Sequence, residues 1–168
     1  MKIIGLIPAR YKSTRFPGKP LELIEGLPMF AHVYFRSKFA NLDNSFVCTD
    51  SYEILNKAKE LKIPTILTSN IHKNGTDRCA EAVKILSLNN NNLIINIQGD
   101  EPFIEPNQIN QLIYAFEDKE VGIVTLCKRV ENIDTLVDSN QPKVKFNENK
   151  KAISFDRVIN TPFEDDIF

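Results

Sequence analysis

The chain has 168 residues, with 21 lysine and arginine side chains against 22 aspartate and glutamate side chains, so its formal net charge is −1. Apolar residues make up 42% and charged residues 26%, a composition typical of a folded globular protein rather than a disordered or fibrous one. A net charge this close to zero argues against a dedicated nucleic-acid-binding protein, which usually carries a basic face.

Short β-branched segments alternate along the chain with segments that repeat apolar residues at helical spacing. Strands are predicted, in chain order, at residues 2–8, 45–49, 65–68, 93–97 and 121–126. Helices are predicted between them at residues 30–40, 50–61, 77–88 and 106–116. Asp50 and Ser51 cap the second of these helices, and Pro106 opens the fourth at its first turn. This alternation predicts an α/β fold of right-handed βαβ units, with a mostly parallel sheet and helices on both faces.

The alternation weakens after residue 130. Two strand-like segments, 144–147 and 152–155, are separated by Glu148-Asn149-Lys150 and predict a hairpin. The chain contains no internal repeat and no stretch with the composition of a flexible linker.

Features of export, membrane insertion or zinc binding are missing from the sequence. The apolar run at residues 3–8 is shorter than a signal-peptide core, and no stretch approaches the ~20 apolar residues of a membrane span. Three cysteines, Cys48, Cys79 and Cys127, and two histidines match no zinc-binding spacing. We therefore expect a cytoplasmic protein with buried or neutral thiols and without membrane contact.

The segment after the first strand has the composition of a polyphosphate site. In open parallel sheets, ligands bind beyond the carboxyl ends of the strands. Residues 8–20 place four cations within ten residues, together with two hydroxyls and one glycine. Cations neutralise phosphate charge, and backbone N–H groups near a glycine can approach phosphate oxygens. The segment matches neither a Walker loop nor a GxGxxG motif. A solvated basic loop is the alternative.

Gln98-Gly99-Asp100-Glu101-Pro102 follows the strand at 93–97. A carboxylate here can hold Mg²⁺, which prefers one or two carboxylates together with substrate phosphates, and Gly99 lets a ligand approach the backbone. A turn in which Asp100 only caps a helix fits the residues equally well.

A third candidate segment, residues 72–78, leads into a helix. Its N–H groups could contact a base edge or a phosphate. Taken alone, the segment is better explained as an ordinary helix start capped by Thr76 or Asp77.

Four motifs together resemble those of the 3-deoxy-manno-octulosonate (Kdo) cytidylyltransferases, or CMP-Kdo synthetases. They are Pro8-Ala9-Arg10-x-x-Ser13-x-Arg15-x-Pro17-Gly18-Lys19-Pro20, Cys48-Thr49-Asp50, Gly75-Thr76-Asp77-Arg78 and Gln98-Gly99-Asp100-Glu101-Pro102. Their order and spacing match the family over most of the chain. The related CMP-sialic acid synthetases share the first loop type, but the last two motifs point to the Kdo branch.

This resemblance implies a Rossmann-like nucleotide-diphospho-sugar transferase fold. It also implies the Mg²⁺-dependent reaction of CTP with Kdo to give CMP-Kdo and pyrophosphate, for lipopolysaccharide biosynthesis. The substrates would be CTP and Kdo, neither nucleic acid nor a membrane would be a partner, and the full-length family is expected to form homodimers.

The resemblance also implies a role for individual residues. The triphosphate would be held by Arg10, Ser13, Arg15 and Lys19. The cytidine would be held by Pro8, Ala9, Gly75, Thr76 and Arg78. Gln98 would lie between nucleotide and sugar, Asp100 would ligate Mg²⁺, and Arg157 would bind the sugar carboxylate. Arg10, Lys19 and Asp100 would be the catalytic residues.

Members of this family are about half as long again, which bears on domain completeness. We therefore expect the C-terminal third to be missing, together with a second magnesium-binding aspartate and much of the dimer contact. Residues 1–130 would form the nucleotide-binding α/β core, and residues 131–168 the start of the sugar-binding and dimerisation part.

Three alternatives remain open at this point. The chain could be a cytidylyltransferase for another acidic sugar, a nucleotide-binding remnant without turnover, or a nucleic-acid module. The last is poorly supported, because the cations of the first loop are not interleaved with a platform of stacking aromatic residues.

Overall fold

The first strand, β1 (Ile3–Pro8), is the centre of a parallel sheet and is buried along almost its whole length. The computed structural model describes residues 1–12 and 16–158 of the chain. The chain folds into two units, residues 1–124 and residues 125–168. The four-stranded sheet belongs to the first unit.

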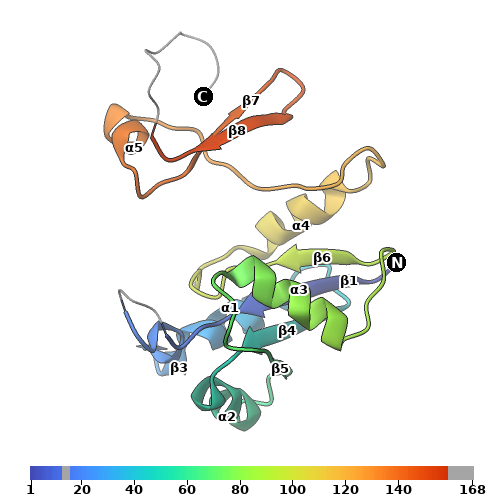
Figure 1. Cartoon of the computed structure of the whole chain (residues 1–168), viewed down its shortest axis with the longest axis vertical. Helices are drawn as coiled ribbons and strands as arrows, with labels where there is room; N and C mark the ends of the chain where they lie inside the picture. The colour runs from blue at the N-terminus through green and yellow to red at the C-terminus, as the bar shows by residue number, and fades with distance from the viewer. Residues whose placement is uncertain (13–15, 159–168) are drawn as a thin grey trace. The chain divides into compact units, whose positions relative to one another are not determined.

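The sheet consists of β1, β4 (Asn44–Thr49), β5 (Thr65–Leu67) and β6 (Leu93–Asn96), in the order β5-β4-β1-β6 (Figure 1). All its pairings are parallel. The chain runs outward from β1 through β4 to β5 and then returns to the other side of β1 as β6. Strand order therefore reverses between β1 and β6, and the carboxyl ends of those two strands are where open α/β sheets bind ligands.

Helices cover both faces of the sheet. Cys79 and Ala82 of α3 (Gly75–Ile85) share one apolar cluster with Ile4 and Leu6 of β1. The other face is covered by α1 (Met29–Ser37), α2 (Tyr52–Glu60) and α4 (Pro106–Ala115), whose cluster contains Ile7. Successive residues of β1 thus point to opposite faces, as the period of a strand requires. The predicted parallel α/β sheet is confirmed.

Of two predicted helix caps, one is confirmed and one is wrong. Ser51 caps α2 as predicted, because its hydroxyl accepts a hydrogen bond from the Ile54 N–H at 3.2 Å. The start of α3 differs from the prediction: the cap is Asn74, whose Oδ1 accepts from the Asp77 N–H at 2.8 Å. The expectation that Thr76 or Asp77 caps this helix is wrong, and α3 begins at Gly75, inside the candidate segment.

A short connection between β1 and α1 was not predicted. It contains the 3₁₀ turn η1 (Lys19–Leu21) and the antiparallel strands β2 (Leu23–Ile24) and β3 (Leu27–Pro28). Glu25 and Gly26 form the turn between the two strands, and both have positive φ, 48° and 78°. Only glycine adopts this conformation without strain, so Gly26 was the available signal.

The strand predicted at residues 121–126 is wrong. These residues have no regular structure, and the side chain of Ile123 is 94% exposed. The prediction rested on a run of Val, Ile, Thr and Leu, but a preference for β-structure depends on a partner strand and a packed face. Among the described residues, β6 pairs only with β1, so this run has neither.

The second unit contains α5 (Ile133–Val137) and the strands β7 (Lys143–Phe146) and β8 (Ala152–Asp156). The two strands pair antiparallel, which confirms the predicted hairpin. No helix in residues 1–12 and 16–158 has both the length and the apolar character to cross a membrane. The thiols of Cys48 and Cys79 are buried as expected, whereas Cys127 is exposed.

Candidate functional site

Three segments that are distant in sequence meet at Pro8, where β1 ends. A Cβ atom placed on Gly75, at the start of α3, would lie 3.0 Å from Pro8 Cγ. A Cβ atom placed on Gly99, in the turn after β6, would lie 2.4 Å from the carbonyl oxygen of Pro8. Both glycines therefore allow their backbones to approach the end of β1. The first loop, the entrance of α3 and the turn after β6 converge at the point where strand order reverses.

Replacement of Gly99 by alanine is expected to destabilise the first unit by about 1–3 kcal/mol, as overpacking does elsewhere. The new methyl group would meet a backbone oxygen, which cannot rotate away as a flexible side chain can. Urea denaturation followed by circular dichroism measures the loss. Gly122→Ala is the matched control, because a Cβ at Gly122 has nothing within 4 Å. Equal stability of the two variants would contradict the close approach of Gly99 to the Pro8 carbonyl oxygen.

An ion pair joins the first loop to the turn after β6. Lys19 Nζ donates a hydrogen bond to Asp100 Oδ2 at 2.8 Å, and the two side chains are 36% and 55% exposed. Lys19 is positioned by Gly18, which has a φ of 76° and whose N–H donates to the Tyr11 carbonyl at 2.8 Å. This hydrogen bond closes the loop on itself. The ion pair therefore sits on a fixed backbone and remains open to solvent.

Arg10 connects the first loop to the segment before α3. Its Nη1 donates to the carbonyl of Lys73 at 2.6 Å, which uses one of the five N–H donors of the guanidinium. The preceding residue, Ala9, is buried, and its N–H donates to the Cys48 carbonyl at 2.9 Å. Two further residues predicted to hold the triphosphate, Ser13 and Arg15, lie outside the described residues.

Arg78 of α3 is buried inside the first unit. Its side chain is fully buried; Nη2 donates to Asp50 Oδ2 at 3.0 Å and Nη1 to Thr68 Oγ1 at 2.5 Å. Among the residues that the structure describes, its buried Nε has no hydrogen-bond partner. The guanidinium therefore ties α3 to the residues that follow β4 and β5. Its predicted contact with the nucleotide stays a prediction, as does that of the exposed Thr76.

A second polar contact fastens the segment in front of α3. Glu81 Oε2 accepts hydrogen bonds from His72 Nε2 at 2.5 Å and from the Ser69 N–H at 2.8 Å. Because a carboxylate only accepts, Nε2 of His72 carries the proton. The hydrogen bond from His72 is the main cause that lowers the pKa of Glu81, and the Ser69 N–H lowers it further.

The lowered pKa of Glu81 makes its stabilising effect dependent on pH. A carboxyl group with a depressed pKa stabilises the folded state at every pH above its unfolded-state pKa, which is about 4.3 for glutamate. This stabilisation is lost as the pH falls through the folded-state pKa. Glu81→Gln is expected to lower the Tm at pH 7 by about 2–4 °C, which corresponds to about 1 kcal/mol. The Tm difference from wild type should stay constant down to about pH 5 and shrink below it.

Differential scanning calorimetry from pH 7 to pH 3.5 measures both features. Glu60→Gln is the control, because Glu60 is paired with Lys57 on an exposed part of α2 at 2.8 Å. If the Tm of Glu81→Gln is still as far below that of wild type at pH 3.5 as at pH 7, the carboxylate charge is not the source of the lost stability.

The two residues predicted to bind the sugar lie in different units. Gln98, in the turn after β6, donates from Nε2 to Asn96 Oδ1 at 3.2 Å. Arg157 follows β8 in the second unit, where its Nη1 contacts the carbonyls of Ser139 at 3.3 Å and Asn140 at 3.2 Å. The predicted role of each in sugar binding stays a prediction.

A metal-binding role fits Asp100 in one specific way. No group of three or more His, Cys, Asp and Glu side chains is placed to hold a metal ion within residues 1–12 and 16–158. Mg²⁺ is commonly bound by one or two carboxylates together with substrate phosphates. An exposed carboxylate beside one cation that suits a triphosphate fits an ion that arrives with a nucleotide, rather than one held by protein side chains alone.

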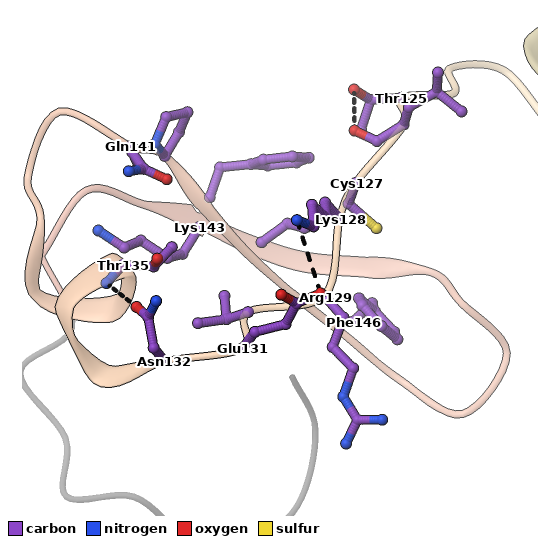
Figure 2. A pocket seen from close by; sticks show the side chains of 15 residues that line it. Thr125, Cys127, Lys128, Arg129, Glu131, Asn132, Thr135, Gln141, Lys143 and Phe146 are labelled. Atoms are coloured by element: carbon purple, nitrogen blue, oxygen red, sulfur yellow. Dashed lines mark hydrogen bonds and ion pairs between the residues drawn. The ribbon is translucent and has the colours of Figure 1, made fainter. Parts of the chain in front are cut away.

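The second unit contains a separate cavity of about 760 Å³ (Figure 2). The cavity is lined by residues 125–132 and 135, by residues 141 and 142 before the hairpin, and by the hairpin itself. Val144, Phe146 and Phe155 of the hairpin supply apolar side chains. Lys128 Nζ lies 3.7 Å from Glu131 Oε1, and both side chains are largely exposed. None of the predicted site residues lines this cavity, so it does not extend the candidate site.

The hydrogen bonds and ion pairs that support the site were not predicted from the sequence. The Asn74-x-x-Asp77 spacing is a helix-start signal of the capping-box type and could have identified the α3 cap. No local pattern links Arg78 with Asp50 or His72 with Glu81, since each contact depends on how the folded chain places the two side chains. The fold is needed to find them.

Comparisons with known proteins agree with this geometry. A family model described as Cytidylyltransferase matches residues 4–167. The 3-deoxy-manno-octulosonate cytidylyltransferase of Parabacteroides distasonis is 45% identical over 163 residues, which is 95% of this chain and 64% of that protein. The 8-amino-3,8-dideoxy-manno-octulosonate cytidylyltransferase of Shewanella sp. (strain W3-18-1) is 43% identical over 160 residues, 94% of this chain and 65% of that protein.

A solved structure of CMP:2-keto-3-deoxy-manno-octonic acid synthetase complexed with CTP superimposes with a TM-score of 0.89 at 33% identity. The match covers 96% of this chain and 67% of that one. The chain thus spans about two thirds of the length of the proteins it matches.

Proposed function

Because the chain belongs to the cytidylyltransferase family, we propose that it transfers the CMP group of CTP to Kdo and releases pyrophosphate. The observation that carries this proposal is the contact of Lys19 with Asp100 beside Pro8. Opposite charges suited to a phosphate and to a divalent cation meet there, in the segments that follow the two strands beyond which an open sheet binds its ligand. The similarity to Kdo cytidylyltransferases supports the choice of substrates.

The proposed reaction needs no nucleophile from the protein. The anomeric hydroxyl of the sugar attacks the α-phosphorus in line and loses its proton to solvent. A new oxygen–phosphorus bond forms, and the bond to the bridging oxygen breaks as pyrophosphate leaves. Phosphoryl-type transfers of this kind depend on positioning and on neutralising charge. This chemistry agrees with a site built from cations and backbone groups.

Each residue has a defined task in this proposal. Arg10 and Lys19 bind the triphosphate and stabilise charge on the α-phosphate and on the leaving pyrophosphate. The cytidine would lie where the backbone of Gly75 packs closely against the ring of Pro8. Asp100 would hold Mg²⁺, which when bound neutralises phosphate charge and polarises the attacked phosphorus. Gln98 would separate nucleotide from sugar.

Two sugars are candidates for the acceptor. The relatives include cytidylyltransferases named for Kdo at 45% identity and for 8-amino-3,8-dideoxy-manno-octulosonate at 43% identity. These values are too close to separate the two sugars. The 8-amino sugar is therefore the second candidate acceptor, and it differs from Kdo by an amino group in place of one hydroxyl. The proposed cytoplasmic location and homodimer remain predictions.

Pyrophosphate release by this chain tests the proposal. The assay contains CTP, Mg²⁺ and one acceptor from a panel of Kdo, the 8-amino sugar and sialic acid, with reactions lacking sugar or containing ATP as controls. Release that requires both CTP and Kdo is the expected result. Release with the 8-amino sugar alone would replace Kdo by that substrate. Binding of CTP without release on any sugar would identify a nucleotide-binding protein without turnover.

A further inference from the structure

We propose that Lys19 blocks divalent metal binding at Asp100 until a triphosphate draws its ammonium group away, so that metal and nucleotide bind this site cooperatively. The inference extends the proposed function, on which the identity of the triphosphate rests. It assigns Lys19 a positioning role toward Asp100 in addition to its predicted contact with phosphate.

The geometry places one cation directly on the oxygen that a metal would use. Lys19 Nζ lies 2.8 Å from Asp100 Oδ2, at hydrogen-bonding distance. The backbones of both residues are held in place, that of Lys19 by the hydrogen bond from Gly18 to Tyr11 and that of Asp100 by the packing of Gly99 on Pro8. The contact therefore joins two side chains whose backbone positions are fixed, while the side chains themselves can still move.

The exposure of the pair makes the exchange feasible. Both side chains are more than one third exposed, and ion pairs of this kind are weak because water and salt screen them. A triphosphate, with several negative charges, can therefore compete with one carboxylate for the ammonium group. In contrast, a metal ion arriving alone meets a positive charge at its ligand and is repelled.

These two effects couple the ligands through one side chain. When the triphosphate binds Lys19, the Asp100 oxygen becomes available to a cation, and the phosphates supply further ligands. By linkage, a metal on Asp100 then favours the state in which Lys19 contacts phosphate. The free protein is expected to bind a divalent cation weakly, which prevents occupation of the site before the nucleotide arrives.

Mn²⁺ binding to the nucleotide-free protein tests the inference without measuring activity. Free Mn²⁺ is quantified by electron paramagnetic resonance during titration of wild type and of Lys19→Met, Lys19→Arg and Lys12→Met. Lys19→Met is expected to bind Mn²⁺ about tenfold more tightly, because the competing charge is gone. Lys19→Arg keeps the charge and should bind as weakly as wild type. Lys12→Met, a charge loss in the same loop, should also match wild type.

The double variant Lys19→Met/Asp100→Asn identifies the metal ligand. It should lose the gain in Mn²⁺ affinity, since Asp100 is the proposed ligand. Unchanged or weaker Mn²⁺ binding by Lys19→Met overturns the inference, as does a tenfold gain that survives in the double variant. Neither result affects CTP-dependent pyrophosphate release by the wild type, so failure of this inference can be distinguished from failure of the proposed function.

Discussion

Replacement of Asp100 by asparagine is expected to lower CTP- and sugar-dependent pyrophosphate release about 10²–10³-fold, the range found when one preorganised charge-stabilising group is removed from an active site. Asparagine has nearly the same shape and can still accept a hydrogen bond from Lys19. It loses only the negative charge that a divalent cation requires. The loss should appear mainly in kcat/KM at saturating Mg²⁺.

Stability separates this effect from a general loss of structure. The Lys19–Asp100 pair is exposed, and such pairs contribute between about 0 and 1 kcal/mol. The Tm of Asp100→Asn should therefore stay within about 2–4 °C of wild type. Glu101→Gln, which neutralises the neighbouring carboxylate, is the matched control and should keep most of the activity. If Glu101→Gln is the more damaging change, the metal ligand has been assigned to the wrong residue.

The fold was predictable where signals are local. The buried strand β1, the helix start at Ser51 and the opening of α4 at Pro106 follow from residue type and spacing within a few positions. The run at residues 121–126 has the same kind of local signal and yet forms no strand. What it lacks is a partner along its edge, and a strand partner cannot be recognised from one segment alone.

The location of the candidate site was predictable for a different reason. Parallel strands bring their carboxyl ends together, so the segments after β1 and β6 had to be neighbours once the βαβ pattern was recognised. The individual partners were not predictable. Lys19 and Asp100 are 81 residues apart, and Arg78 and Asp50 are 28 apart. Charge type alone does not choose among the chain's 21 basic and 22 acidic side chains.

Replacement of Arg78 by leucine is expected to destabilise the first unit by about 3–5 kcal/mol, the range for breaking a buried ion pair from one side. The substitution leaves the Asp50 carboxylate, which is 15% exposed, without its cation, and it removes the hydrogen bond to Thr68. Urea denaturation measures the loss. Arg36→Leu is the matched control, because Arg36 pairs with Glu105 at 2.7 Å in an exposed position, and about 1 kcal/mol is expected there.

The double variant Arg78→Leu/Asp50→Asn distinguishes support of the site from direct contact with the nucleotide. Removing the stranded carboxylate charge should recover about 1–2 kcal/mol of the lost stability, within the range of coupling energies for residues in contact. If Arg78 acts by holding the segment before α3, CTP affinity should recover together with stability. If Arg78 binds the nucleotide itself, stability should recover while CTP affinity stays low. In that case the guanidinium would have to leave its buried position when CTP binds.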